Sequence, residues 1–190
     1  VYKRQLPLCA FGVSRGGVAA LTAACRYPRI RAVLADSSFG TMGMTRHFVQ
    51  RFGHLIIPEQ FFKILPAWHI DHTLRTAMRL SEKSRNCRYV HLEKEVVHLD
   101  GTPVHLISGK RDSYVSPDVA RSLADLFGGE KILWLVDKAK HNMARSVAEQ
   151  KYDQRVLEHF ESVALKKTSE ADSPDSGATL STGQTAPAPR

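Results

Sequence analysis

The chain has 190 residues, 43% of them hydrophobic, and a formal net charge of +8. This length allows one substantial core and requires no second domain. The basic residues are scattered rather than gathered in one run, so we expect a generally basic surface and no nucleic-acid partner. No apolar stretch approaches the roughly 18 residues that cross a bilayer, and no signal peptide pattern opens the chain.

The cysteine count bears on the compartment. Cys9, Cys25 and Cys87 are an odd number, and the first two fall in segments that we predict to be a buried strand and a buried helix. We therefore expect free thiols, which slightly favours a reducing, cytoplasmic setting.

The first elements predict a strand, helix, strand unit. Leu6–Phe11 is a short apolar run that ends at Gly12, as is typical of a strand buried on both faces of a parallel sheet. A helix rich in small residues begins near Gly16 and is closed by Pro28. Arg31–Asp36 is a second buried strand.

The segment from Gly40 to about Asp100 has no clean strand period and contains plausible helices. One is predicted from Pro58 to Pro66, and another from about Asp71 to Lys83, with Asp71 placed to cap its start. We interpret this region as a mostly helical covering of one end of the sheet.

The remaining sequence returns to the alternation of strands and helices. We predict strands at Val104–Ser108 and Ile132–Val136, and helices at Val119–Phe127 and about Met143–Val163. Beyond about Lys166 the composition shifts to small and polar residues without any aromatic residue, so residues 166–190 are predicted to be a disordered tail.

A nucleophile elbow is the strongest local motif. The segment 12–16 reads Gly-Val-Ser-Arg-Gly, between a predicted buried strand and a helix of small residues. The glycines on either side of Ser14 let strand and helix approach closely, and Gly17 relieves further crowding. The turn raises the Ser14 hydroxyl above the sheet edge, and the backbone N–H of Arg15 points to where an oxyanion would form.

A serine hydroxyl needs a base, and that base needs an acid to orient it. Asp112 follows a buried strand in a Gly-x-x-Asp-x-x-Val-x-Pro segment, and His141 follows the next strand. The order along the chain is therefore serine, aspartate, histidine.

Together these three segments resemble the α/β-hydrolase family over roughly Leu6–Val163, most closely its esterase, lipase and serine-aminopeptidase-like members. The resemblance implies an α/β fold, with a mostly parallel sheet flanked by helices and a helical cap. It also implies Ser14 as nucleophile, His141 as general base and acid, Asp112 as orienting carboxylate and the Arg15 N–H as an oxyanion donor.

The chain departs from the family pattern at its front, where the first strands and the loop with the second oxyanion donor would precede the elbow. We therefore expect residues 1–165 to be a partial hydrolase domain with its cap at about residues 40–100. Losing one oxyanion donor costs about a hundredfold to a thousandfold in rate, and an exposed strand edge favours misfolding. The chain alone is predicted to be inactive or misfolded, with activity in a longer parent.

Two other carboxylates compete with Asp112 as the acid. Asp137 follows the last predicted strand, but there it is typical of a polar strand end. Asp36 also follows a strand, and some family members take the acid from that position, but Ser37 and Ser38 beside it favour a turn.

Histidines and aromatic residues offer weaker signals. His69-Ile70-Asp71-His72 matches no established metal site, and we interpret it as a polar helix start. His105 lies in an apolar strand, where a hydrogen-bonded structural histidine is usual. Five aromatic residues could line an acyl pocket or form the core of the cap: Phe48, Phe52, Phe61, Phe62 and Trp68.

The functional hypothesis is a serine hydrolase that cleaves a carboxylic ester or related acyl bond through an acyl-enzyme, without a cofactor or metal. A peptidase or amidase with the same triad, acting on short peptides, stays open, because it differs only in pocket and leaving group. A non-catalytic binding module with the hydrolase fold is the alternative outside enzymes.

Overall fold

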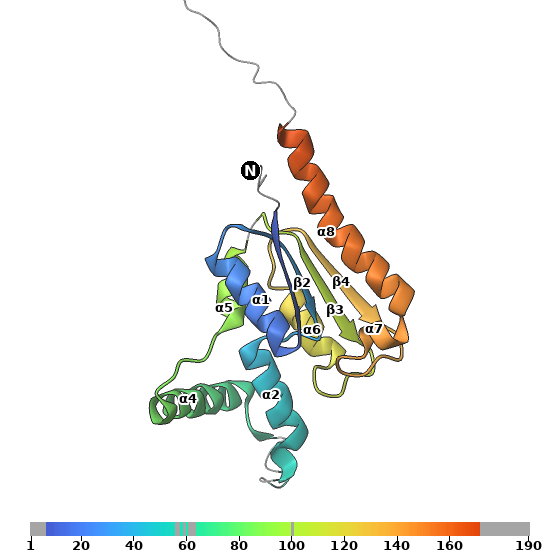
Figure 1. Ribbon diagram of the computed structural model, residues 1–190. Coiled ribbons are helices and arrows are strands. Elements are labelled where there is room, and N and C mark those ends of the chain that lie inside the picture. Colours follow the sequence, from blue (N-terminus) through green and yellow to red (C-terminus); the bar gives the residue numbers. More distant parts are fainter. Residues whose placement is uncertain (1–6, 56–57, 59, 61–63, 100, 172–190) are drawn as a thin grey trace, which may run out of the picture.

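The computed structural model describes residues 7–55, 58, 60, 64–99 and 101–171 (Figure 1). The elements run in this order: β1 (Leu8–Val13), α1 (Arg15–Arg26), β2 (Ile30–Asp36), α2 (Thr41–Phe52), η1 (Gly53–Leu55), α4 (Ala67–Arg85), α5 (Leu92–Glu95), η2 (Val96–His98), β3 (Val104–Gly109), α6 (Pro117–Ala124), β4 (Lys131–Val136), α7 (Ala144–Val147) and α8 (Glu149–Ala171).

Four parallel strands form one sheet within the described residues, in the order β1-β2-β3-β4. Val13 pairs with Asp36, which pairs in turn with Ile107. Gly109 pairs with Val136 at the ends of the next two strands. Because the carboxyl ends of parallel strands meet at one edge, the loops after all four strands emerge together.

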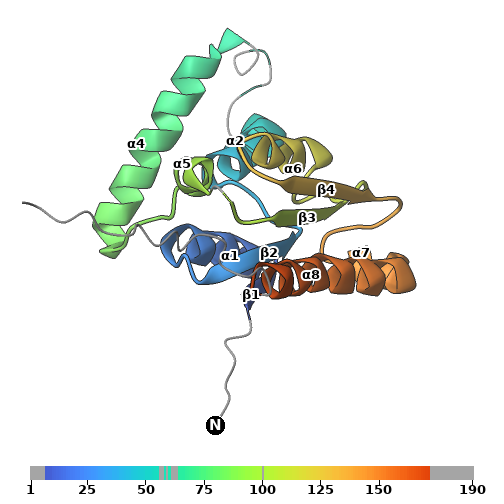
Figure 2. The same ribbon diagram turned by 90° about the horizontal axis from the view of Figure 1, so that it is seen from above.

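Helices cover both faces of the sheet, as predicted for this fold class (Figures 1 and 2). Val33 and Ala35 of β2 belong to the core cluster that includes α1 and α6. Leu34, which points to the other face, packs in the cluster that includes α7 and α8. This alternation along one strand produces the three layers.

The central strand agrees with the sequence prediction, and the first strand does not. Residues 32–35 of β2 are fully buried. In β1, by contrast, Leu8 and Phe11 are 54% and 51% exposed, so the predicted burial on both faces is wrong. The reason is its place at the edge of the described sheet, where α1 is the helix that packs on it.

The segment between β2 and β3 is mostly helical in its described part, as predicted. The second predicted helix is longer at both ends, and Asp71 does not cap it. Pro66 precedes α4 without a side-chain cap, and Asp71 instead accepts hydrogen bonds from Arg46 of α2. Residues 59 and 61–63 of the predicted helix from Pro58 to Pro66 lie outside the described residues, so this helix stays a prediction.

Helix α6 begins and ends earlier than predicted. Pro117 takes the first helical position, and the hydroxyl of Ser116 accepts the N–H of Val119. The helix ends at Ala124, and the apolar Phe127 that suggested a longer helix is buried beyond its end.

The last predicted helix is two helices, α7 and α8, separated by Ala148, whose φ of −135° is not helical. Helix α8 continues to Ala171, so the prediction of disorder from Lys166 is wrong for residues 166–171. Lysine, glutamate and alanine in this stretch favour helix, which explains the extension. The rest of the predicted tail, residues 172–190, lies outside the described residues.

Cys9, Cys25 and Cys87 form no disulfide. The first two are partly buried, and burial raises the pKa of both thiols. Among the described residues, no helix has the length and apolar composition needed to span a membrane.

Candidate active site

Ser14 occupies the sharp turn between β1 and α1. Its φ of 54° lies in the left-handed region, which is strained for a residue other than glycine. Its N–H donates to the Asp36 carbonyl over 2.7 Å, and its own carbonyl accepts the N–H of Gly17 at 3.0 Å. These bonds hold the strained turn at the carboxyl edge of the sheet.

Two glycines allow β1 and α1 to approach each other closely, but Gly16, which the motif also suggested, is not one of them. A Cβ on Gly12 would overlap the carbonyl of Gly16, and a Cβ on Gly17 would overlap the hydroxyl of Ser38. A Cβ at Gly16 would meet nothing within 4 Å. The expectation that Gly16 relieves crowding is therefore wrong, and Gly12 and Gly17 have that role.

A hydrogen-bond relay joins the three residues that the sequence singled out. The Ser14 hydroxyl lies 3.1 Å from His141 Nε2, and His141 Nδ1 lies 2.7 Å from Asp112 Oδ2. An ionised carboxylate can only accept, so Nδ1–H donates to Asp112. Nε2 is then the lone-pair nitrogen and accepts the Ser14 O–H, as a general base must.

The backbone fixes the Asp112 carboxylate in position. Its side chain is fully buried, and its second oxygen accepts the N–H groups of Tyr114 at 2.8 Å and Val115 at 2.9 Å. A Cβ on Gly109 would overlap the carbonyl of Ala139. Gly109 therefore allows the loop after β3 that carries Asp112, the acid loop, to lie against the loop after β4 that carries His141.

The other two carboxylates have different partners. Asp137 is exposed and pairs with Lys110 at 2.8 Å, and that hydrogen bond lowers its pKa. Asp36 is buried and accepts hydrogen bonds from Ser37 and Tyr152. Burial raises the pKa of the Asp36 carboxyl, and the two hydroxyl donors act in the opposite direction.

Arg15 is the first residue of α1, directly after Ser14. The N–H groups in the first turn of a helix have no carbonyl partner within that helix and lie at its positive end. The arrangement therefore suits the Arg15 N–H to an anion that forms beside the Ser14 hydroxyl.

Sequence reasoning missed two neighbours of the triad. The Tyr114 ring lies 5.4 Å from the His141 ring and is 58% exposed, so it flanks the imidazole toward solvent. Arg51 of α2 donates to the carbonyl of Ser113 over 3.0 Å and so ties α2 to the acid loop. Tyr114 lies inside the acid motif and could have been noticed, whereas Arg51 is 62 residues from its partner and gives no local signal.

An apolar hollow of about 320 Å³ lies on α2. Two of the five predicted aromatic residues, Phe48 and Phe52, line it and stack with centroids 5.7 Å apart. Trp68 is exposed beside His69 and does not line it. Phe61 and Phe62 lie outside the described residues. The full lining is Met44, Thr45, Phe48, Val49, Phe52 and Gly53.

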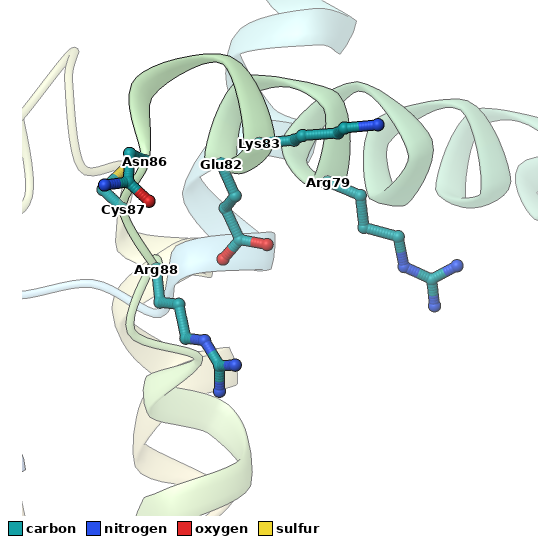
Figure 3. A pocket seen from close by; sticks show the side chains of 6 residues that line it. All are labelled: Arg79, Glu82, Lys83, Asn86, Cys87 and Arg88. Carbon is teal, nitrogen blue, oxygen red and sulfur yellow. The ribbon is translucent and has the colours of Figure 1, made fainter.

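A second hollow, of about 570 Å³, lies at the carboxyl end of α4 (Figure 3). Its basic side chains, Arg79, Lys83 and Arg88, spread apart rather than converge on one point. None of the triad residues lines it.

In the described part of the chain, no group of three or more histidine, cysteine, aspartate or glutamate side chains could hold a metal ion. The polar cluster at residues 69–72 is used elsewhere, since Asp71 pairs with Arg46 and His69 packs edge-on against Trp68.

His105 is buried in β3, as expected, but the expected hydrogen bond is absent. Neither ring nitrogen has a hydrogen-bond partner among the described residues, and the ring packs edge-on against His159, with centroids 5.4 Å apart. Burial, with the charges of His159 and Arg155, lowers the pKa of His105 to about 4.

No protein-family model matches the chain, and a comparison with curated proteins found no match. Solved structures do match. An esterase of Pyrococcus furiosus is 18% identical, with a TM-score of 0.54 over 80% of this chain and 52% of its own. The protein Rv0554 of Mycobacterium tuberculosis is 17% identical, with a TM-score of 0.55 over 83% and 66%. The α/β hydrolase GrgF of a Penicillium species is 12% identical, with a TM-score of 0.54 over 82% and 63%.

The chain spans between about half and two thirds of the length of these structures. At such identities the likeness concerns the fold, and it agrees with the parallel sheet covered by helices on both faces. The chain therefore has the α/β-hydrolase fold.

Proposed function

We propose that the full-length protein is a serine hydrolase that cleaves a carboxylic ester or related acyl bond. The observation that carries this proposal is the continuous relay from the Ser14 hydroxyl through His141 to the buried Asp112. A relay on a strained turn, with its acid held by two backbone N–H groups, is the arrangement that activates a serine.

The proposed reaction proceeds through an acyl-enzyme. Ser14 Oγ attacks the ester carbonyl while His141 Nε2 takes its proton, and Asp112 stabilises the resulting imidazolium. The Arg15 N–H donates to the oxyanion of the tetrahedral intermediate. His141 then gives the proton to the leaving alcohol. Water, deprotonated by His141, attacks the acyl-enzyme and releases the acid.

The hollow on α2 is the feature from which we infer an apolar acyl group in the substrate. Phe48 and Phe52 lie on the same helix as Arg51, whose guanidinium bonds to the residue next to Asp112. Ser14, Asp112 and His141 do not line the hollow, and its link to the loop of Asp112 is Arg51 of the same helix. We propose that substrates are small-molecule esters with a hydrophobic acyl chain.

Chromogenic substrates test the proposal and separate it from the peptidase alternative. We expect the full-length protein to hydrolyse p-nitrophenyl esters faster than aminoacyl p-nitroanilides, with kcat/KM rising from acetate to longer acyl chains. Ser14→Ala removes the activity, and Ser81→Ala on α4 serves as the matched control that keeps it. Preference for the anilides would favour the peptidase, and no turnover of either by a folded protein would favour the binding module.

The expectation that the 190-residue chain alone is inactive or misfolded stays a prediction. It is tested by assaying this chain and the full-length protein side by side, with circular dichroism to establish folding. Ester hydrolysis at equal rates by both would contradict it.

A further inference from the structure

A buried polar network lies beneath the relay without belonging to it. The backbone N–H of Asn142 donates to Ser37 Oγ at 3.3 Å, and that hydroxyl donates to Asp36 Oδ1 at 2.9 Å. The Tyr152 hydroxyl donates to Asp36 Oδ2 at 3.0 Å. The carbonyl of Asp36 accepts the N–H of Ser14. The network thus touches the residue after His141 and the nucleophile itself.

These bonds join segments that the chain keeps far apart. Ser37 and Asn142 are 105 residues apart, and Asp36 and Tyr152 are 116 apart. Tyr152 comes from α8, which packs on the sheet face opposite α1 (Figure 1). The N–H of Ser37 also donates to the carbonyl of Ile107 over 2.7 Å, which ties the network to β3.

The backbone at these positions needs support. Ser14, Ser37 and Asn142 have φ values of 54°, 51° and 58°, all in the left-handed region. Non-glycine residues hold such conformations where the surrounding structure determines them. Each of the three residues makes a hydrogen bond within the network.

The direction of the hydrogen bonds requires an acceptor at residue 36. Ser37 Oγ accepts the N–H of Asn142, so its single proton is free to go to Asp36. The proton of Tyr152 goes to the other carboxylate oxygen. An amide at this position would present N–H to one hydroxyl and could not accept from both.

We propose that Asp36 is a positioning residue that, through Ser37 and Tyr152, holds the loop of His141 in place relative to Ser14. This inference rests on the proposed hydrolase function and extends it to residues that touch neither substrate nor the reacting atoms. The network sets how often the relay is aligned, so its loss lowers kcat and leaves substrate binding unchanged.

The test compares Asp36→Asn and Tyr152→Phe with the wild-type protein in ester hydrolysis, together with denaturant unfolding. We expect Asp36→Asn to lower kcat by about 30-fold and Tyr152→Phe by about tenfold, with KM within about twofold of wild type. The double variant should lose much less than the product of the two factors, because both substitutions break the same link. If Asp36→Asn does not fold, Tyr152→Phe, which removes one hydroxyl, provides the test.

Leu123→Val is the control for stability alone. It removes apolar volume from the core cluster beneath α6 on the other sheet face, so it should lower stability and leave kcat unchanged. Network variants that keep wild-type kcat, or lose it only in proportion to their stability, would overturn the inference. A folded wild-type protein without hydrolysis would overturn the proposed function itself, and this inference with it.

Discussion

The carboxyl edge of the sheet and the helices α2 and α4 are built in different ways. At the sheet edge, Asp36 and Asp112 are buried, and each carboxylate accepts at least two hydrogen bonds. In α4 only Leu74 is buried, and α2 has no fully buried residue. The difference teaches that the chemistry that depends on exact position is concentrated where loops are tied into the sheet, whereas surface residues of α2 and α4 can change with little cost to the fold.

The largest difference is expected when one aspartate in each region is replaced by asparagine. Asp112→Asn removes the acceptor that orients His141, so kcat should fall by about 10⁴-fold with little loss of structure. Asp71→Asn in α4 changes an exposed pair with Arg46, and kcat should stay unchanged. Steady-state ester hydrolysis by both variants checks the contrast, and equal rates would contradict it.

Replacing one glycine in each region by alanine compares how tightly the backbone is packed at the sheet edge and in α2. Gly12→Ala puts a Cβ into the backbone carbonyl of Gly16 and should cost about 3 kcal/mol of unfolding free energy or prevent folding. Gly43→Ala in α2 meets open space and should stabilise by up to about 1 kcal/mol, because alanine favours helix. Urea unfolding measures both, and a tolerated Gly12→Ala would show that the elbow is not tightly packed.

Burial of His105 predicts that the free energy of unfolding depends on pH. His105 has its pKa lowered to about 4 from 6.5, so between these values the unfolded chain binds a proton that the native state does not. The free energy of unfolding should therefore decrease as pH falls below about 6.5, by on the order of 2 kcal/mol near pH 4. Above about pH 6.5 the stability contributed with His105 neutral is fully present.

The measurement is urea unfolding at about pH 7 and about pH 4.5. His105→Leu should lose part of the acid sensitivity, and His72→Leu on the exposed side of α4 should keep it. The same pH dependence in wild type and His105→Leu would assign the acid sensitivity to other groups.

The smallest effect is expected for the ion pair that joins α2 and α4. Arg46 and Asp71 lie 2.6 Å apart but are partly exposed, and such pairs contribute about 0.5 kcal/mol or less. Arg46→Met should therefore change the unfolding free energy by about that amount in low salt and by less in high salt. A much larger loss would show that the helical region is more tightly coupled than its burial indicates.

The sheet and the approach of Ser14, His141 and Asp112 to one another could be predicted because the segments that carry them have local signals. The apolar run at residues 32–35 requires burial, and a serine flanked two residues away by Gly12 and Gly16, directly after a strand, favours a tight turn. Asp112 and His141 could be placed because parallel strands bring their following loops to one edge.

The rest has no local signal. Helix α2 is an exception, because Met44, Phe48 and Phe52 are spaced by four and would predict a helix, although none of its side chains is fully buried. The bonds of Asp36 with Tyr152 and of Arg51 with Ser113 join residues that are distant in sequence, and nothing near either partner announces the other. Gly16 shows the opposite error, because the motif implied crowding where the structure has open space.

Fluorophosphonate labelling of the full-length protein, with mass spectrometry to locate the adduct, tests the central claim most directly. We predict one adduct on Ser14, absent in Ser14→Ala, slowed in His141→Ala and unchanged in Ser81→Ala. A folded protein that carries no adduct on Ser14 would contradict the claim and favour a binding module with the hydrolase fold.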